Sequence, residues 1–339
     1  MAHHYETIKY TRTKIKQAGK KYVSPSASQT EKDDALVLIN NWRSAHSFPM
    51  QIIYVHLKKS APENSIVAQR LKRIYSITQK LCRFPNMSLT SMQDIGGCRV
   101  IVNSIDEVYA LVTKLKNSRM RHNRKEEYDY IKSPKPDGYR SYHLVLSYQS
   151  DRNASYNGLF IEIQIRTHLQ HVWGTAVETM DTFTGDPIKI GQGSPENREF
   201  FRLVSKLFEQ YEKNDYDINS VKDSAELHQL QDFSKTNDII QKMKTIQRVA
   251  DYVSSIDKKE QGYYVLRLNR KSSQLTINPF DKTQNEEATT YYDLAEKNRT
   301  QFDDIVLVST TSFSNLQQAY PNYFTDVSEF VRLLEKMLN

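Results

Sequence analysis

Apolar and polar residues alternate strictly along residues 159–167, L-F-I-E-I-Q-I-R-T. Alternation with a period of two predicts a β-strand that has one dry face and one polar face. The dry face carries Leu159, Ile161, Ile163 and Ile165, and the polar face carries Glu162, Gln164 and Arg166. A carboxylate, an amide and a guanidinium are costly to bury without partners. The polar face therefore indicates either a binding surface for a phosphate- or hydroxyl-bearing ligand or a solvent-facing edge strand.

Spacings of three and four residues between apolar positions predict helices in the preceding and following segments. Capping-box pairs mark the starts of two of them, Thr167 with Gln170 and Ser28 with Glu31. The predicted helices are residues 167–181, the segment after Ser28, the segment after Pro49, residues 66–82 and residues 105–117. A β-branched run at 98–102 predicts a buried central strand, and residues 142–148 predict a strand that neighbours 159–167. Strands and helices that alternate in this order indicate a mixed α/β sheet.

The C-terminal third predicts a small α+β module. Its expected elements are a helix at 228–256, short strands at 263–268, 273–277 and 305–308, and helices at 290–297 and 326–337. We therefore predict an α/β (α+β) fold in two domains. Residues 1–227 form a mixed β-sheet domain flanked by helices, and residues 228–339 form a linking helix and the small module.

Composition narrows the class of protein. The 339 residues suffice for two domains, and 47 Lys and Arg against 40 Asp and Glu give a net charge of +7. This excess favours polyanions, nucleotides or RNA as ligands, although it also occurs in proteins that bind none of these. Cys82 and Cys98 are the two cysteines, so a disulfide framework and a four-cysteine zinc site are both excluded. No apolar run reaches the roughly 18 residues of a membrane span, and we expect a cytoplasmic protein.

The predicted helix 66–82 carries a polar stripe. Lys72, Ser76 and Lys80 lie at intervals of four residues, with Arg70 close by in the sequence. This stripe either grips a polyphosphate or is a solvated helix face.

Three further segments contain candidate chemistry. Asp94 stands before two glycines and the buried strand, where it is either a divalent-metal ligand or the cap of a turn. A basic tract that could track a phosphate backbone contains Arg119, Arg121, Arg124 and Lys125. The loop 129–143 has groups able to hold phosphate and stack a base, namely Lys132, Lys135, Tyr139, Arg140 and His143.

Four of these segments, in order and spacing, resemble the synthetase domain of RelA/SpoT proteins. They are R-L-K-R-I-Y-S-I-T-Q-K (70–80), D-I-G-G-C-R (94–99), D-Y-I-K-S-P-K-P-D-G-Y-R-S-Y-H (129–143) and E-I-Q-I-R-T (162–167). The resemblance covers roughly residues 30–225. It implies transfer of the β,γ-pyrophosphate of ATP to a ribose 3′-hydroxyl, with release of AMP and with Mg²⁺ as cofactor. The chain contains no His-Asp dipeptide, so we expect no hydrolase domain of the kind found in long family members.

The resemblance also implies a role for each candidate residue. Arg70 and Arg99 would sandwich adenine, and Lys72, Ser76 and Lys80 would grip the triphosphate. Asp94 would hold Mg²⁺, and Glu162 would contact the metal or act as general base toward the acceptor hydroxyl. Tyr139 would stack the acceptor's base. The other implied acceptor-binding residues are Lys132, Lys135, Arg140, His143, Gln164 and Arg166.

Weaker similarities refine the prediction. Residues 166–179 (R-T-H-L-Q-H-V-W-G-T-A-V-E-T) and 42–46 (W-R-S-A-H) resemble the toxic branch of small alarmone synthetases, whose acceptor is the 3′-terminal adenosine of tRNA. Residues 319–324 (A-Y-P-N-Y-F) resemble the antitoxin-like segment of CapRel-type fused toxin–antitoxin proteins. There, Tyr320 and Tyr323 would block the ATP site, although two tyrosines around a proline turn also pack readily into their own module.

These similarities predict a monomeric anti-phage defence protein. The tRNA acceptor end and ATP would be its partners, the basic tract would bind tRNA, and the C-terminal module would bind a phage-derived activating protein. One alternative is a (p)ppGpp or (p)ppApp synthetase that acts on free nucleotides. The other is a non-catalytic RNA-binding module.

Overall fold

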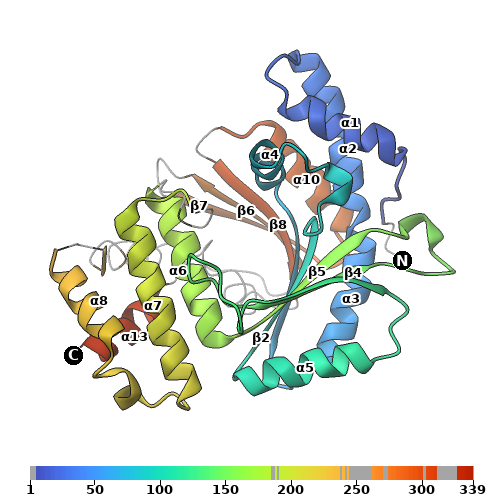
Figure 1. Cartoon of the computed structure of the whole chain (residues 1–339). Coiled ribbons are helices and arrows are strands. Elements are labelled where there is room, and N and C mark those ends of the chain that lie inside the picture. Colours follow the sequence, from blue (N-terminus) through green and yellow to red (C-terminus); the bar gives the residue numbers. More distant parts are fainter. Residues whose placement is uncertain are drawn as a thin grey trace.

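The strands of the protein form one mixed sheet with helices packed around it (Figure 1). The computed structural model describes residues 5–184, 188, 191–236, 239–240, 243, 262–269, 274–300, 303–310 and 327–338. Within these residues the sheet has eight strands in the order β3-β4-β5-β2-β1-β8-β6-β7. This architecture confirms the predicted α+β class with a mixed sheet.

The first part of the chain supplies a five-stranded half-sheet. Its strands, in spatial order, are β3 (Asn123–Asp129), β4 (Tyr142–Ser147), β5 (Phe160–Thr167), β2 (Gly96–Val102) and β1 (Ile66–Leu71). β2 and β5 run parallel, and the other neighbouring pairs are antiparallel. The predicted pairing of residues 142–148 with 159–167 is confirmed, with Leu144 opposite Ile163.

The C-terminal strands extend this half-sheet. They are β8 (Asp303–Thr310), β6 (Gly262–Asn269) and β7 (Gln274–Phe280), and they confirm the three predicted strands. β8 joins β1 through two opposed residue pairs, Gln69 with Ser309 and Arg70 with Val308. The predicted domain boundary at residue 227 falls inside α8 (Ala225–Thr236), and the division into two domains stays a prediction.

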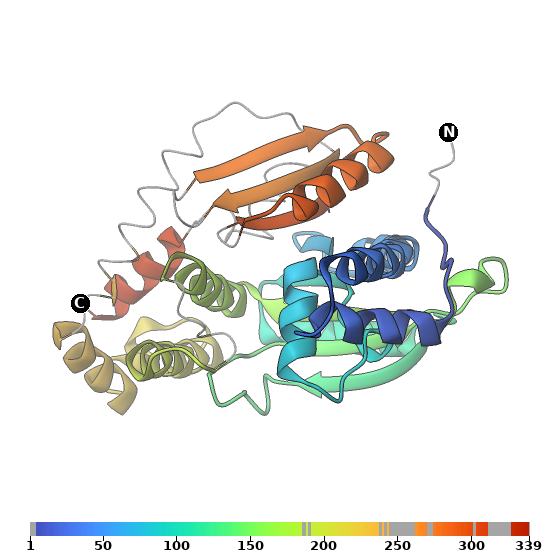
Figure 2. The same cartoon turned by 90° about the horizontal axis from the view of Figure 1, so that it is seen from above.

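Helices cover the sheet in groups that follow the chain (Figures 1 and 2). α3 (Ser47–Ser60) and α5 (Ile105–Asn117) pack on the apolar face of β5 and β2. The remaining helices are α1 (Arg12–Val23), α2 (Gln29–Ala45), α4 (Ile74–Arg83), α6 (His168–Thr184), α7 (Pro195–Lys213), α10 (Asn285–Lys297), α13 (Ser328–Leu338) and the short turns η1 (Leu89–Ser91), η2 (Ala154–Tyr156) and η4 (Ile218–Val221). Among the described residues, no helix combines the length and the apolar character that crossing a membrane requires.

The alternation in β5 has the predicted effect. Ile161, Ile163 and Ile165 are fully buried against α3 and α5, while Glu162 and Gln164 lie on the opposite face and are half-buried. The helix predicted at 105–117 is confirmed as α5.

The prediction of one helix over residues 66–82 is wrong. Residues 66–71 form β1, and the helix α4 begins only at Ile74. The apolar spacing of Leu71, Ile74 and Leu81 fits a helix, but β1 obtains its backbone partners from β2 and β8, which are distant in sequence. Local periodicity cannot register such pairing.

Two other predicted boundaries also change. Residues 123–129, predicted as part of a basic tract without an assigned element, form the edge strand β3. The helix predicted at 228–256 begins at Ala225, and most of its second half lies outside the described residues. The final helix, α13, packs with α6, α7 and α8 around Phe200 and Phe330, so it belongs to the core of the preceding helices (Figure 2).

Gly96 and Gly97 offer a matched test of packing at the start of β2. A Cβ on Gly96 would lie 2.6 Å from Ile161 Cδ1 and 3.3 Å from His46 Cβ, whereas the nearest atom to a Cβ on Gly97 would be 3.8 Å away. We expect Gly96→Ala to lower the free energy of unfolding by about 1–3 kcal/mol because it overpacks the core. Gly97→Ala should change it by less than about 0.5 kcal/mol. Urea denaturation of both variants checks this, and equal losses would contradict it.

Candidate active site

Strand register gathers the polar residues on one face of the half-sheet, here called the site face. Residues directly opposite in neighbouring strands share a face. Gln164 of β5 lies between His143 of β4 and Arg99 of β2. In the neighbouring row, Glu162 lies opposite Gly97, which in turn lies opposite Arg70 of β1. Gly97 has no side chain, so no side chain stands between Arg70 and Glu162 in this row.

Two lysines converge on one carboxylate beside this face. Lys72 Nζ lies 2.8 Å from Asp94 Oδ2, and Lys80 Nζ lies 3.0 Å from Asp94 Oδ1. Burial opposes ionisation of Asp94, but the two lysines outweigh it and hold the pKa of the carboxyl well below its usual range. Burial also lowers the pKa of Lys72, against the attraction of Asp94. The arrangement therefore brings two ammonium groups within reach of a single anion.

The position of Lys72 is fixed by its backbone. Its N–H donates to Ile95 O at 2.7 Å, and its carbonyl accepts from Arg43 Nε at 2.8 Å. Lys80 lies two helical turns on, in the last turn of α4, with half-buried Ser76 between them. The structure thus brings the predicted Lys72, Ser76 and Lys80 to one region, although Lys72 precedes the helix.

Glu162 is the centre of a second network. His143 Nδ1 lies 3.0 Å from Glu162 Oε1, and Gln164 Nε2 donates to Glu162 Oε2 at 2.7 Å. Tyr139 Oη lies 2.9 Å from His143 Nε2. Burial alone would raise the pKa of Glu162, but the charge of His143 lowers it. Burial likewise opposes the charge on His143, yet Tyr139 and Glu162 raise its pKa to about 9.

Arginines make this region strongly positive. Arg166 is 4% exposed, and one of its terminal nitrogens contacts His171 Nδ1. Burial, followed by the charge of Arg99, lowers the pKa of Arg166 to about 9. A Cβ on Gly174 would lie 2.9 Å from Arg166 Nη1, so this glycine makes room for the guanidinium. The sequence predicted no role for His171 or Gly174. Both lie in the segment 166–179, whose similarity to the toxic branch could have indicated them.

The predicted acceptor-loop residues separate in the structure. Lys135 lies over Tyr130 and Tyr139, on the site face, whereas Lys132 lies over Tyr109 of α5, on the opposite face. Arg140 is 3% exposed and forms a 2.7 Å ion pair with buried Glu212 of α7. Arg140 therefore ties the loop to α7, a contact that its position in the motif did not reveal.

The remaining predicted residues divide by exposure. The four basic residues Arg119, Arg121, Arg124 and Lys125 are exposed at the edge of the sheet, around β3. Arg121 pairs with Asp151 at the surface. Tyr320 and Tyr323 lie outside the described residues.

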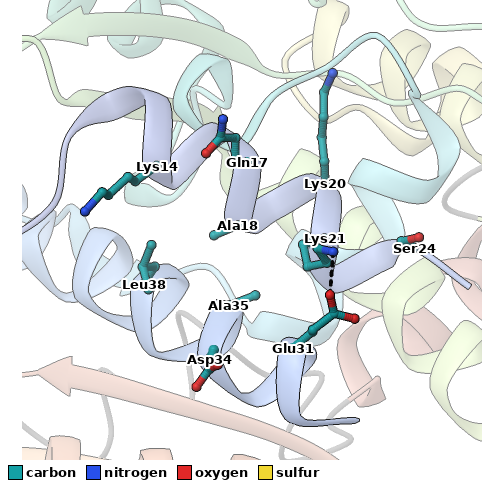
Figure 3. Close-up of a pocket in the computed structure, with 10 residues that line it drawn as sticks. All are labelled: Lys14, Gln17, Ala18, Lys20, Lys21, Ser24, Glu31, Asp34, Ala35 and Leu38. Atoms are coloured by element: carbon teal, nitrogen blue, oxygen red, sulfur yellow. Dashed lines mark hydrogen bonds and ion pairs between the residues drawn. The ribbon is translucent and has the colours of Figure 1, made fainter. Parts of the chain in front are cut away.

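A groove of about 660 Å³ lies away from the site face, between α1 and α2 (Figure 3). Lys21 and Glu31 form an ion pair 2.7 Å long across one end of it. Ala18, Ala35 and Leu38 line its floor. None of the predicted catalytic residues lines this groove.

The residues around Asp94 fit a metal that takes most of its ligands from elsewhere. Among the described residues, no group of three or more His, Cys, Asp or Glu could form an all-protein metal cage. Mg²⁺ usually needs only one or two carboxylates when water and nucleotide phosphates complete its shell. Asp94 and Glu162 are close enough for their charges to interact, so the two carboxylates predicted as metal ligands lie in one region.

Comparison with known proteins links this region to a family. Residues 69–181 match the family model described as "Region found in RelA / SpoT proteins". The chain is 32% identical over 117 residues to the GTP pyrophosphokinase YjbM of Bacillus subtilis, covering 34% of this chain and 55% of that protein. It is 27% identical over 166 residues to the GTP pyrophosphokinase YwaC of the same organism, covering 44% of this chain and 78% of that protein. The chain thus spans about half the length of the first of these relatives.

Solved structures also match. The crystal structure of small alarmone synthetase 1 from Bacillus subtilis bound to its product pppGpp is 25% identical. The match covers 50% of this chain and 90% of that chain, with a TM-score of 0.41.

The Arg140–Glu212 pair can be tested apart from any ligand. We expect Arg140→Met to lower the free energy of unfolding by about 3–5 kcal/mol, because it leaves the buried Glu212 carboxylate without its ion-pair partner. The double variant Arg140→Met, Glu212→Leu should recover part of this loss, since it removes the unpaired charge but leaves the Thr167 hydroxyl and the Gln170 amide without their acceptor. Thermal unfolding followed by circular dichroism measures both. A single variant as stable as the wild type would mean that Arg140 has no structural role.

Proposed function

We propose that the chain is an ATP-dependent pyrophosphokinase that transfers the β,γ-pyrophosphate of ATP to a ribose 3′-hydroxyl. One observation carries the proposal: two cations and an ionised carboxylate lie side by side. Lys72 and Lys80 converge on Asp94, and the ionised carboxylate of Glu162 lies on the adjoining sheet face. Pyrophosphoryl transfer needs positive charge on the phosphates and an oriented, deprotonated nucleophile. The RelA/SpoT match across residues 69–181 supports the same chemistry.

On the donor side, the triphosphate replaces Asp94 as the anion held by Lys72 and Lys80. Both lysines are already positioned, so little reorganisation is needed when the phosphates arrive. Mg²⁺ bound with ATP would neutralise charge on the phosphates, with Asp94 and Glu162 as its protein ligands. Arg70 and Arg99, which flank Gly97, hold the adenine.

On the acceptor side, Glu162 takes the proton of the attacking hydroxyl. His143 and Gln164 each hold one carboxylate oxygen, which fixes the direction of the remaining lone pairs. Tyr139 and Lys135 lie beside this position and hold the acceptor nucleotide, while Lys132 and Arg140 are directed elsewhere. A non-catalytic RNA-binding module would have no use for two carboxylates, Asp94 and Glu162, in this region.

We further propose that the acceptor is the 3′-terminal adenosine of tRNA, so that the product blocks translation. The exposed basic tract supports this acceptor, since it offers phosphate contacts before and on β3, the strand next to β4. The second candidate is synthesis of (p)ppGpp or (p)ppApp from free nucleotides. It is favoured by the relatives, which are named GTP pyrophosphokinases. Incubation with γ-labelled ATP, bulk tRNA, GTP and GDP distinguishes the two by where the label appears.

Contacts of the C-terminal residues support control of this activity by the chain itself, as in a fused toxin–antitoxin protein. Arg43, which holds the Lys72 carbonyl, is fully buried and lies 4.2 Å from the ring centroid of Tyr292 on α10. The two terminal nitrogens of Arg43 have no hydrogen-bond partner among the described residues. The cation–π contact with Tyr292 is therefore a main interaction of this guanidinium group. β8 also pairs with Arg70.

In the proposed closed state, the C-terminal residues hold Arg43 and β1 while Tyr320 and Tyr323 occupy the adenine site. A phage-derived protein that binds the C-terminal residues would release them. Holding activity near 1% requires the closed form to be favoured by only about 2.7 kcal/mol, and a desolvated cation–π contact supplies about 2 kcal/mol.

Glu162→Gln should lower the rate of transfer by about 10²- to 10⁴-fold, because it removes the general base while keeping the shape of the side chain. Binding of ATP without Mg²⁺, measured by isothermal titration calorimetry, should stay within about threefold of the wild type, a change of less than 1 kcal/mol, because the substitution leaves Lys72 and Lys80 in place. Transfer at the wild-type rate would show that Glu162 is not the base.

Reversing the charge of the basic tract, by Arg121→Glu with Arg124→Glu, should weaken tRNA binding. Each lost phosphate contact removes about one released counterion, so the variant should show a shallower salt dependence and a larger deficit at 50 mM than at 200 mM salt. Filter binding across this range measures it. Lys213→Glu with Lys222→Glu, which changes the net charge equally on another surface, is the control. Equal losses in both double variants would contradict a specific tract.

Tyr292→Ala should raise transfer activity and make expression toxic, because it removes the ring that covers Arg43 and weakens the closed state. Leu294→Ala, at a 57% exposed position on the same helix, should have no effect. Tyr320→Ala and Tyr323→Ala should act like Tyr292→Ala. Truncation is a poorer test, since it also removes α13 from the core. A folded Tyr292→Ala protein that binds ATP but is inactive would show that the C-terminal residues support the site.

A further inference from the structure

Two tyrosines form a stacked, partly exposed pair at the outer edge of the sheet. Tyr128 lies on β3, and Tyr130 follows directly after the strand ends. Their rings are parallel to within 2°, with centroids 5.7 Å apart. Tyr128 is 36% exposed, and its hydroxyl donates to Glu126. Tyr128 is therefore partly open to solvent, with the ring of Tyr130 stacked beside it.

Register places this pair on the site face. Tyr128 lies opposite His143, which lies opposite Gln164. The ring of Tyr130 meets His143 edge-on, with ring centroids 5.2 Å apart. In the strand order β3-β4-β5-β2-β1, Glu162 lies on β5, the tyrosine pair lies toward β3, and Arg70 lies toward β1. Two strand spacings, about 10 Å, separate β3 from β5.

Cations accompany the stacked rings. Lys135 Nζ lies 4.4 Å from the ring centroid of Tyr130. Lys125 is exposed on the same strand as Tyr128, next to Glu126, which accepts from the Tyr128 hydroxyl. Arg124 lies opposite Leu146 and therefore belongs to the other face of the sheet. Stacking surfaces lined by basic residues are the usual means of binding single-stranded nucleic acid, because every base has a flat face and every nucleotide has a phosphate. An apolar protein partner would have no need of the cations.

We infer that the exposed ring of Tyr128 stacks the nucleobase that precedes the terminal nucleotide of a single-stranded RNA acceptor. This inference rests on the proposed function, since it takes the terminal ribose to lie at Glu162. The terminal base lies at Tyr139, the preceding base lies on Tyr128 beside Tyr130, and Lys135 lies next to the stack where it can contact a phosphate. The stack makes a polynucleotide end a better acceptor than a free nucleotide.

The test uses the full-length protein and two RNA octamers that end in C-C-A. One octamer is intact, the other lacks the base of the penultimate nucleotide, and both end in 3′-deoxyadenosine, which has no 3′-hydroxyl, so that no transfer occurs. We expect the wild type to bind the intact octamer about five- to hundredfold more tightly, the range of a single base–aromatic stack. Tyr128→Phe should keep this preference because it keeps the ring. Tyr128→Leu, which keeps apolar bulk without a ring, should lose it. Fluorescence anisotropy of 5′-labelled octamers measures the dissociation constants.

A wild type without the preference, or a Tyr128→Leu variant that retains it, would overturn the inference. Transfer of label from γ-labelled ATP to a 3′-hydroxyl octamer is measured separately. If the binding preference is present but no RNA accepts label, the proposed function fails and the stacking site stands. If RNA accepts label and Tyr128→Leu slows transfer to AMP as much as transfer to the octamer, the ring serves the terminal nucleotide and the inference fails.

Discussion

The site depends on one constraint, the two-sidedness of β5. Three isoleucines of this strand are fully buried against α3 and α5, and burying them fixes which way every other residue of the strand points. Glu162, Gln164 and Arg166 must then share the opposite face. Since β5 lies between β4 and β2, the same register brings His143 and Arg99 to either side. A slip of one residue would move the whole set into the core.

Electrostatics then determines what this face can bind. Burial lowers the pKa of Arg166, and the charges of Arg99 and Arg70 both lower it further, whereas Tyr139 and Glu178 raise it. Asp94 provides an anion for Lys72 and Lys80. The two lysines are thus held in place by an internal carboxylate. On the proposed function, an incoming phosphate replaces it, which would account for an acidic residue among these cations.

The end of the chain is coupled to this region through backbone and packing rather than through catalytic side chains. β8 completes the edge of β1, and the ring of Tyr292 covers the guanidinium that holds Lys72. Both contacts act on elements that position Arg70 and Lys72. α13 instead returns to the core of α6 and α7, so the C-terminal residues bind the first part of the chain at two separate places.

The sequence by itself determined the features that arise from local pattern. Period-two alternation identified β5, three- and four-residue spacing identified α5, and the ordered motifs singled out Lys72, Asp94 and Glu162, which lie in one region. Tertiary structure alone decided the features that depend on distant partners. β1 is a strand because β2 and β8 supply its hydrogen bonds, and Arg140 is structural because Glu212, 72 residues away, lies beside it. The sheet also brought Tyr128 to the face of Glu162, because cross-strand register, unlike spacing along the chain, is set only when the strands pair.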